Sequence, residues 1–105
     1  MTKEESALVG FEIVAYAGDA RSKLVNALKA AEEGNYDEAE ELIAAATKCM
    51  NHAHQVQTEM LQAEARGEEV DVGFIMIHGQ DHLMTTMLLK DVISNFITLY
   101  KRTNI

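Results

Sequence analysis

Apolar residues recur at intervals of three and four along three long stretches of the chain, which is the spacing of one face of an α-helix. The first stretch covers about residues 3–33. It opens on Thr2-x-x-Glu5, a spacing at which the two side chains can cap each other's backbone. It ends at Gly34, a residue suited to the left-handed turn that follows many helices. This stretch therefore predicts a first helix.

The second and third stretches predict two more helices of similar length. Asn35 is placed to cap the second helix, whose near-heptad apolar stripe ends at Arg66-Gly67. The third helix is predicted to begin between residues 72 and 75 and to end near Arg102. Basic residues gather toward its C-terminal end, where they interact favourably with the helix dipole.

Three such helices joined by two short connections predict an all-α fold, an up-down-up antiparallel three-helix bundle. The composition agrees with it, because the chain has fourteen alanines and no proline. An all-β domain would need β-branched runs and turn residues that this chain lacks. The length of 105 residues fits a single domain, residues 1–105.

The apolar surface exceeds what two neighbouring helices can cover, notably in residues 72–77 and 84–89. An exposed apolar stripe of that size usually marks an interface, so we expect a homo-oligomer. Gly10 and Gly18 lie inside the first helix, where each costs up to about 1 kcal/mol relative to alanine unless another backbone packs closely. Both glycines therefore predict tight contacts.

The net charge limits the kinds of partner that this chain is expected to bind, and the cysteine content indicates its cellular compartment. A net charge of −8 argues against nucleic acid and anionic membranes, and no apolar run approaches the roughly 20 residues that span a bilayer. The acidic N-terminus does not have the pattern of a signal or transit peptide. A single cysteine, Cys49, favours the reducing cytoplasm. We expect Cys49 to be a small buried apolar residue, with only Lys48 as a cation in register.

Polar side chains interrupt the apolar pattern at His78, Asp81 and His82. These positions, i, i+3 and i+4, share one face of a helix. A neutral imidazole is nucleophilic near pH 7 and can accept a phosphoryl group. The start of a helix favours that group through its free N–H groups and its dipole. The alternative is that these histidines are structural, as a single histidine on an apolar face usually is.

Metal binding is a second alternative for the same residues. Two histidines at i and i+4 can share zinc, but Gly79 stands where a metalloprotease helix needs glutamate. Cys49, His52 and His54 would have to complete a structural zinc site, and the two histidines are only two residues apart. Asp81 alone binds a divalent ion poorly, whereas three copies on a three-fold axis would hold Mg²⁺ through oxygen ligands.

Two segments, residues 10–23 and residues 78–86, closely resemble the enzyme IIA component of the lactose/cellobiose family of bacterial sugar phosphotransferase systems. The likeness extends over essentially the whole chain. It implies a homotrimer of three-helix subunits in the cytoplasm. His78 matches the phosphorylated histidine of the family, and Asp81 matches its metal-binding aspartate, which holds one Mg²⁺ per trimer. His82 is expected to have an auxiliary catalytic role.

The resemblance also implies the partners. Phosphate arrives from the histidine-containing phosphocarrier protein and leaves for a cysteine of the IIB component, during uptake of lactose, cellobiose or diacetylchitobiose. Lactose is our first choice of sugar, and no direct insertion into the membrane is expected. Both partners should dock on an apolar surface around His78, with Met76 and Ile77 as a rim that excludes water. The rival hypothesis is a non-catalytic helical scaffold or metal-binding protein with structural histidines.

Overall fold

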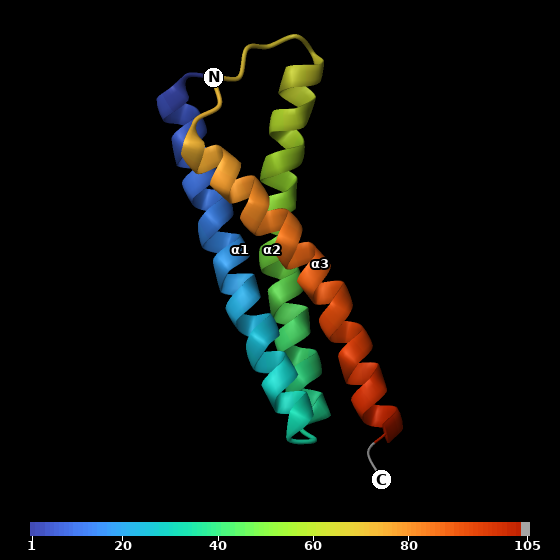
Figure 1. The fold of residues 1–105 in the computed structure, drawn as a ribbon. Coiled ribbons are helices and arrows are strands. Elements are labelled where there is room, and N and C mark those ends of the chain that lie inside the picture. Colours follow the sequence, from blue (N-terminus) through green and yellow to red (C-terminus); the bar gives the residue numbers. More distant parts are fainter. Residues whose placement is uncertain (104–105) are drawn as a thin grey trace.

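The computed structural model describes residues 1–103 and consists of three α-helices of 30 residues each. These are α1 (Lys3–Glu32), α2 (Tyr36–Ala65) and α3 (Phe74–Thr103). They run up, down and up in a bundle of 56 × 20 × 18 Å (Figure 1). The prediction of an all-α antiparallel three-helix bundle is confirmed, and the predicted helix limits agree with the structure to within one or two residues.

The helix ends follow local chemistry. At the start of α1 the Glu5 backbone N–H donates to the Thr2 hydroxyl (3.2 Å), and the Thr2 N–H donates to the Glu5 carboxylate (3.0 Å). These bonds hold the pKa of Glu5 below its ordinary value. Gly34 follows α1 with a φ of 84°, as predicted. Asn35 is the N-cap residue of α2, as predicted, but its side chain makes no capping hydrogen bond.

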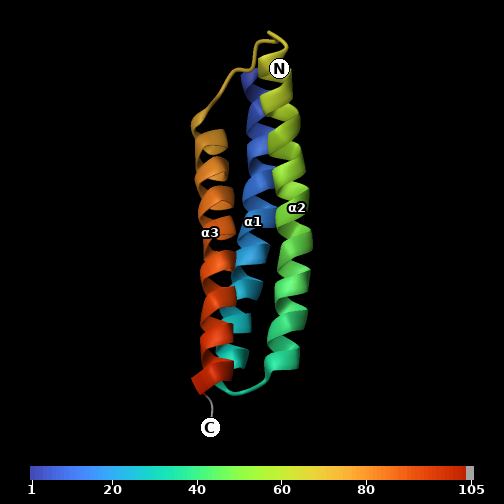
Figure 2. The same ribbon diagram turned by 90° about the vertical axis from the view of Figure 1, so that its right-hand side faces the viewer.

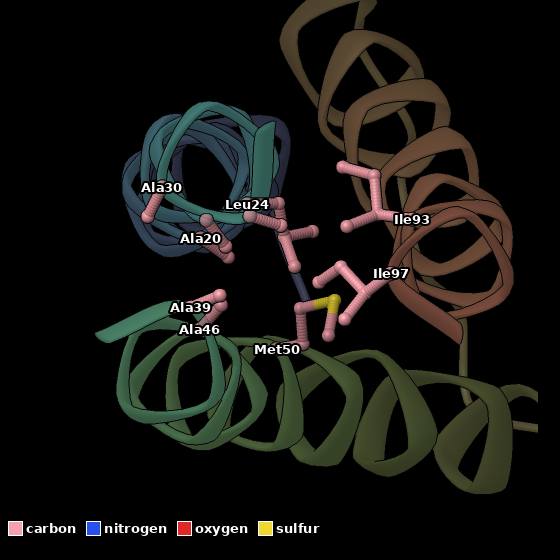
Figure 3. Close-up of a cluster of buried hydrophobic side chains, with 10 residues drawn as sticks. Ala20, Leu24, Ala30, Ala39, Ala46, Met50, Ile93 and Ile97 are labelled. Carbon is pink, nitrogen blue, oxygen red and sulfur yellow. The ribbon is translucent and has the colours of Figure 1, made fainter. Parts of the chain in front are cut away.

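Helix α1 forms the middle of the bundle. It packs extensively against both α2 and α3, whereas α2 and α3 contact each other far less, and Figure 2 shows α1 between them. The main core gathers where Leu24 meets Met50, Ile93 and Ile97 (Figure 3). Several small alanines of α1 and α2, among them Ala20 and Ala46, face each other across the same core. The docking of α3 therefore depends mainly on its contact with α1.

The first turns of α3 approach α1 closely because two glycines meet there. A Cβ atom built on Gly10 would lie 3.0 Å from backbone atoms of Met76, and one on Gly79 would lie 3.0 Å from the Gly10 carbonyl oxygen. The predicted tight contact at Gly10 is confirmed. The prediction for Gly18 is wrong, since nothing lies within 4 Å of its added Cβ.

A single copy of the chain leaves much apolar surface exposed, as the pattern predicted. The exposed large apolar side chains lie chiefly on α1 and α3 and include Leu8, Phe11, Val25, Phe74, Ile77, Met84, Leu88, Val92, Phe96 and Leu99. On α3, Met84, Leu88, Val92, Phe96 and Leu99 recur at three and four residues, so they form one continuous stripe. Within residues 1–103, the helices are not long and apolar enough to cross a membrane.

Candidate functional site

His78 lies in the second turn of α3 and is exposed. Side chains on a helix lean toward its N-terminus, so the imidazole leans toward the first turn of α3. The first N–H groups of a helix lack intrahelical acceptors, and the dipole is positive at that end. The surroundings of His78 therefore favour an added anionic group.

His82 stands next to His78, one helical turn further along α3. The two ring centroids are 5.2 Å apart and the ring planes meet at 83°, an edge-to-face arrangement. His82 is half-buried, and its Nδ1 atom is buried without a hydrogen-bond partner in the described part of the chain. The structure thus brings together the two predicted catalytic histidines, one accessible and one partly enclosed.

Two glutamines fix this part of α3 against α2. The Gln57 amide group donates a hydrogen bond to the Gln80 side-chain oxygen, and Gln57 is only 7 % exposed. Gln57 also contacts the Met84 sulfur at 3.6 Å. Together with the Gly10–Gly79 contact, these bonds hold the segment that carries His78 from both sides. This pair was not predicted from the sequence, although Gln57, in register with the apolar stripe of α2, was the available signal.

Asp81 is exposed, and it brings one carboxylate per chain to this face of α3. Among residues 1–103, no three His, Cys, Asp or Glu side chains are grouped closely enough to hold a metal ion. The described residues therefore do not bring Cys49, His52 or His54 to His78 and His82 to complete a zinc site. His52 is instead 2.9 Å from the Glu12 carboxylate and packs against the Tyr16 ring.

Cys49 differs from the prediction. It is half-buried, and its thiol donates to the Asp19 carboxylate at 3.4 Å. Burial and this carboxylate raise the pKa of the Cys49 thiol. The neighbouring cation is Lys23, which pairs with Asp19 at 2.7 Å, and not the predicted Lys48. A thiol with a raised pKa is less ionised near neutral pH, so Cys49 is a weak nucleophile.

The apolar surface beside His78 is a groove of about 270 Å³ between α2 and α3. Its lining residues are Gln57, Met60, Leu61, Glu64, Val70, Val72, Met76, Ile77 and Gln80. Ile77 is 51 % exposed, which is compatible with the predicted place in a water-excluding rim. Met76 cannot serve in this way, because it is buried against α1 and only 3 % exposed.

An accessible histidine on the surface of a helical bundle suits a carrier that passes a small group between protein partners. Residues 8–101 match the family described as "PTS system, Lactose/Cellobiose specific IIA subunit", and the chain belongs to that family. It is therefore a phosphotransferase component that relays phosphoryl groups in a bacterial sugar-uptake system. The resemblance inferred from the sequence is confirmed.

The relatives carry three different sugar names. The chain is 59% identical to the "PTS system lactose-specific EIIA component" of Streptococcus mutans, over 97% of this chain and 98% of the relative. The cellobiose-specific enzyme IIA of Bacillus anthracis superimposes with a TM-score of 0.89 at 39% identity, covering 97% of this chain and 92% of that one. The IIA(Chitobiose) chain of Escherichia coli, solved in complex with HPr, superimposes with a TM-score of 0.80 at 30% identity, covering 100% of this chain and 99% of that one.

Proposed function

We propose that His78 is the residue on which this chain carries the phosphoryl group. The observation that supports it best is the accessible His78 ring, which lies edge-on to His82 near the start of α3. A protein donor can reach this ring without any movement of the bundle. His82 is close enough to interact with the charge that the added group brings, which is the auxiliary role expected from the sequence.

The relay consists of two group transfers that need no redox step. In the first, the lone pair of a His78 ring nitrogen attacks phosphorus, and the bond from phosphorus to the donor's histidine nitrogen breaks. In the second, a cysteine thiolate of the acceptor attacks the same phosphorus, and the bond to His78 breaks. Each transfer needs donor and acceptor atoms roughly in line with water kept out. The exposed side chain of Ile77 and the apolar groove beside it supply surface for that purpose.

The partners we propose are a histidine-containing phosphocarrier of the HPr type as donor and a IIB component as acceptor. The structurally similar IIA(Chitobiose) protein was solved with HPr, which supports the donor. We propose lactose as the transported sugar, because identity falls from 59% to the lactose-specific relative to 39% and 30% to the other two. The chain relays phosphate in the cytoplasm and need not contact the sugar.

The test of this function is transfer from phosphorylated HPr to the purified chain. One transfer adds the mass of one phosphoryl group, and that group is labile in acid and stable in base, as phosphohistidine is. Peptide mapping under basic conditions should place it on the peptide that contains His78. A phosphate found on His52 or His54, the two exposed histidines of α2, or no transfer at all, would contradict the proposal.

We further propose that three chains assemble as a homotrimer in which Asp81 of each chain faces the three-fold axis. The exposed apolar stripe of α3 supports this arrangement, since burial of that surface favours association. Three carboxylates a few ångströms apart would repel one another strongly, and a bound cation relieves that repulsion. Oxygen ligands fit Mg²⁺ better than zinc. One chain supplies one carboxylate, so the donor set fits the ion only in the trimer.

Replacing Asp81 with leucine is expected to remove the metal and to keep the trimer, because apolar replacement of buried charge is often neutral or stabilising. Elemental analysis should give one Mg²⁺ per three wild-type chains and none for Asp81→Leu. Asp91→Leu, at an exposed position of the same helix, is the matched control and should retain the metal. Sedimentation of the wild-type chain as a monomer at micromolar concentration would contradict the assembly.

A further inference from the structure

One threonine inside the helices behaves differently from the rest. Threonine hydroxyls in helices commonly donate to the carbonyl four residues earlier. Five of the six threonines within α1–α3 do so, with distances from 2.6 to 3.1 Å: Thr47, Thr58, Thr85, Thr98 and Thr103. The sixth, Thr86, makes no hydrogen bond through its hydroxyl in the described part of the chain.

Thr86 is only 1 % exposed, so bulk solvent does not reach its hydroxyl. A buried polar group without a partner is costly, and a valine would fill nearly the same space without that cost. The carbonyl four residues earlier, that of His82, already receives a bond of 3.3 Å from the Thr85 hydroxyl. The Thr86 hydroxyl does not use this carbonyl, so it remains open to another acceptor.

His82 supplies the complementary group. Within residues 1–103, its Nδ1 and the Thr86 hydroxyl are the two buried side-chain polar atoms without a partner. The two residues are four apart on α3, so their side chains are neighbours on one face of the helix. An imidazole nitrogen that carries no proton is an acceptor, and a hydroxyl is a donor.

The structure does not pair these two atoms with each other, so a bond between them requires a rotation of the Thr86 or His82 side chain. We propose that this rotation occurs and that Thr86 is a positioning residue for the phosphoryl relay, whose hydroxyl then donates a hydrogen bond to Nδ1 of His82. This inference rests on the proposed role of His78. A bond accepted at Nδ1 places the proton of neutral His82 on Nε2 and fixes the plane of the ring. The Nε2–H group then faces the half-exposed side of the ring beside His78, where it donates to a phosphoryl oxygen. Thr86 thus acts on the reaction only through His82.

The direct test is the nitrogen NMR spectrum of the His82 ring in the unphosphorylated wild-type chain, at a pH where both imidazoles are neutral. We expect an unprotonated Nδ1 and a protonated Nε2 in a single conformation. Thr86→Ser keeps the hydroxyl and should give the same spectrum, whereas Thr86→Val should give mixed tautomers or ring orientations. Thr98→Val, which removes an exposed hydroxyl more than three turns away on α3, is the matched control and should change nothing.

The same variants test the effect on the reaction. Thr86→Val should slow phosphoryl transfer from HPr about tenfold at saturating donor, with little change in the donor concentration that half-saturates the rate, and Thr86→Ser should restore the rate. A proton on Nδ1 of His82 in the wild-type chain would overturn the proposal, as would an unchanged His82 spectrum and rate in Thr86→Val. The wild-type spectrum gives this answer even if Thr86→Val does not fold. It also stays valid if His78 is not the acceptor, so the two proposals fail separately.

Discussion

Replacing His78 with alanine is expected to abolish phosphoryl acceptance and to leave the bundle folded. The substitution removes the proposed nucleophile, and no other imidazole occupies that place on α3. His78 is exposed, so its removal should change the free energy of unfolding by no more than about 0.5 kcal/mol. The measurement is the mass of the chain after incubation with phosphorylated HPr, together with the circular dichroism of the variant.

Two further histidine variants control this result. His54→Ala removes an exposed imidazole from α2 and should be phosphorylated at the wild-type rate. His82→Ala should slow transfer without preventing it, because the role proposed for His82 is to assist and not to carry the group. Undiminished labelling of His78→Ala would refute the assignment. Complete loss of labelling in His82→Ala would mean that the two histidines share the role or exchange it.

Alanine substitutions at two glycines of α1 are expected to have opposite effects on stability. Gly10→Ala forces a methyl group to within 3.0 Å of the Met76 backbone, so α1 and α3 must separate, at a cost of about 1–3 kcal/mol. Gly18→Ala meets nothing within 4 Å and should stabilise α1 by about 0.5–1 kcal/mol. Urea unfolding at a fixed chain concentration measures both, since association contributes to stability.

The result at Gly10 also bears on the site. Because Gly79 packs on the Gly10 carbonyl oxygen, a displaced α3 carries its neighbour His78 with it. Phosphoryl transfer should therefore fall in Gly10→Ala and stay unchanged in Gly18→Ala. Equal effects of the two substitutions on stability would contradict the close helix crossing.

The sequence was sufficient to predict the helices, because periodic apolar positions and the ends at Thr2 and Gly34 are local signals. The same local signals could not separate Gly10 from Gly18. Both break the helical pattern equally, and only the position of α3 decides which one meets another backbone. Asn35 shows a related limit, since a residue of the right type at a helix start need not direct its side chain to the cap.

The site was predictable in part for a similar reason. Positions 78, 81 and 82 stand out because polar residues at helical spacing interrupt an apolar run. The Gln57–Gln80 bond joins residues from two helices, so it depends on how those helices are aligned along their length. The missing hydrogen bond of the Thr86 hydroxyl was not predictable either, because the hydroxyl of a threonine in a helix normally donates to a backbone carbonyl of the same helix.

The two connections between the helices differ in length, and this difference bears on the order of assembly. Residues 33–35 join α1 to α2 across a three-residue turn, whereas residues 66–73 lead into α3. Contacts between segments that are neighbours in sequence form fast. Contacts between distant segments form more slowly, because closing a longer loop costs more chain entropy. The α1–α2 hairpin should therefore collapse first, and α3 should dock along the exposed face of α1 afterwards. His78 would then reach its final surroundings only in the last step of folding.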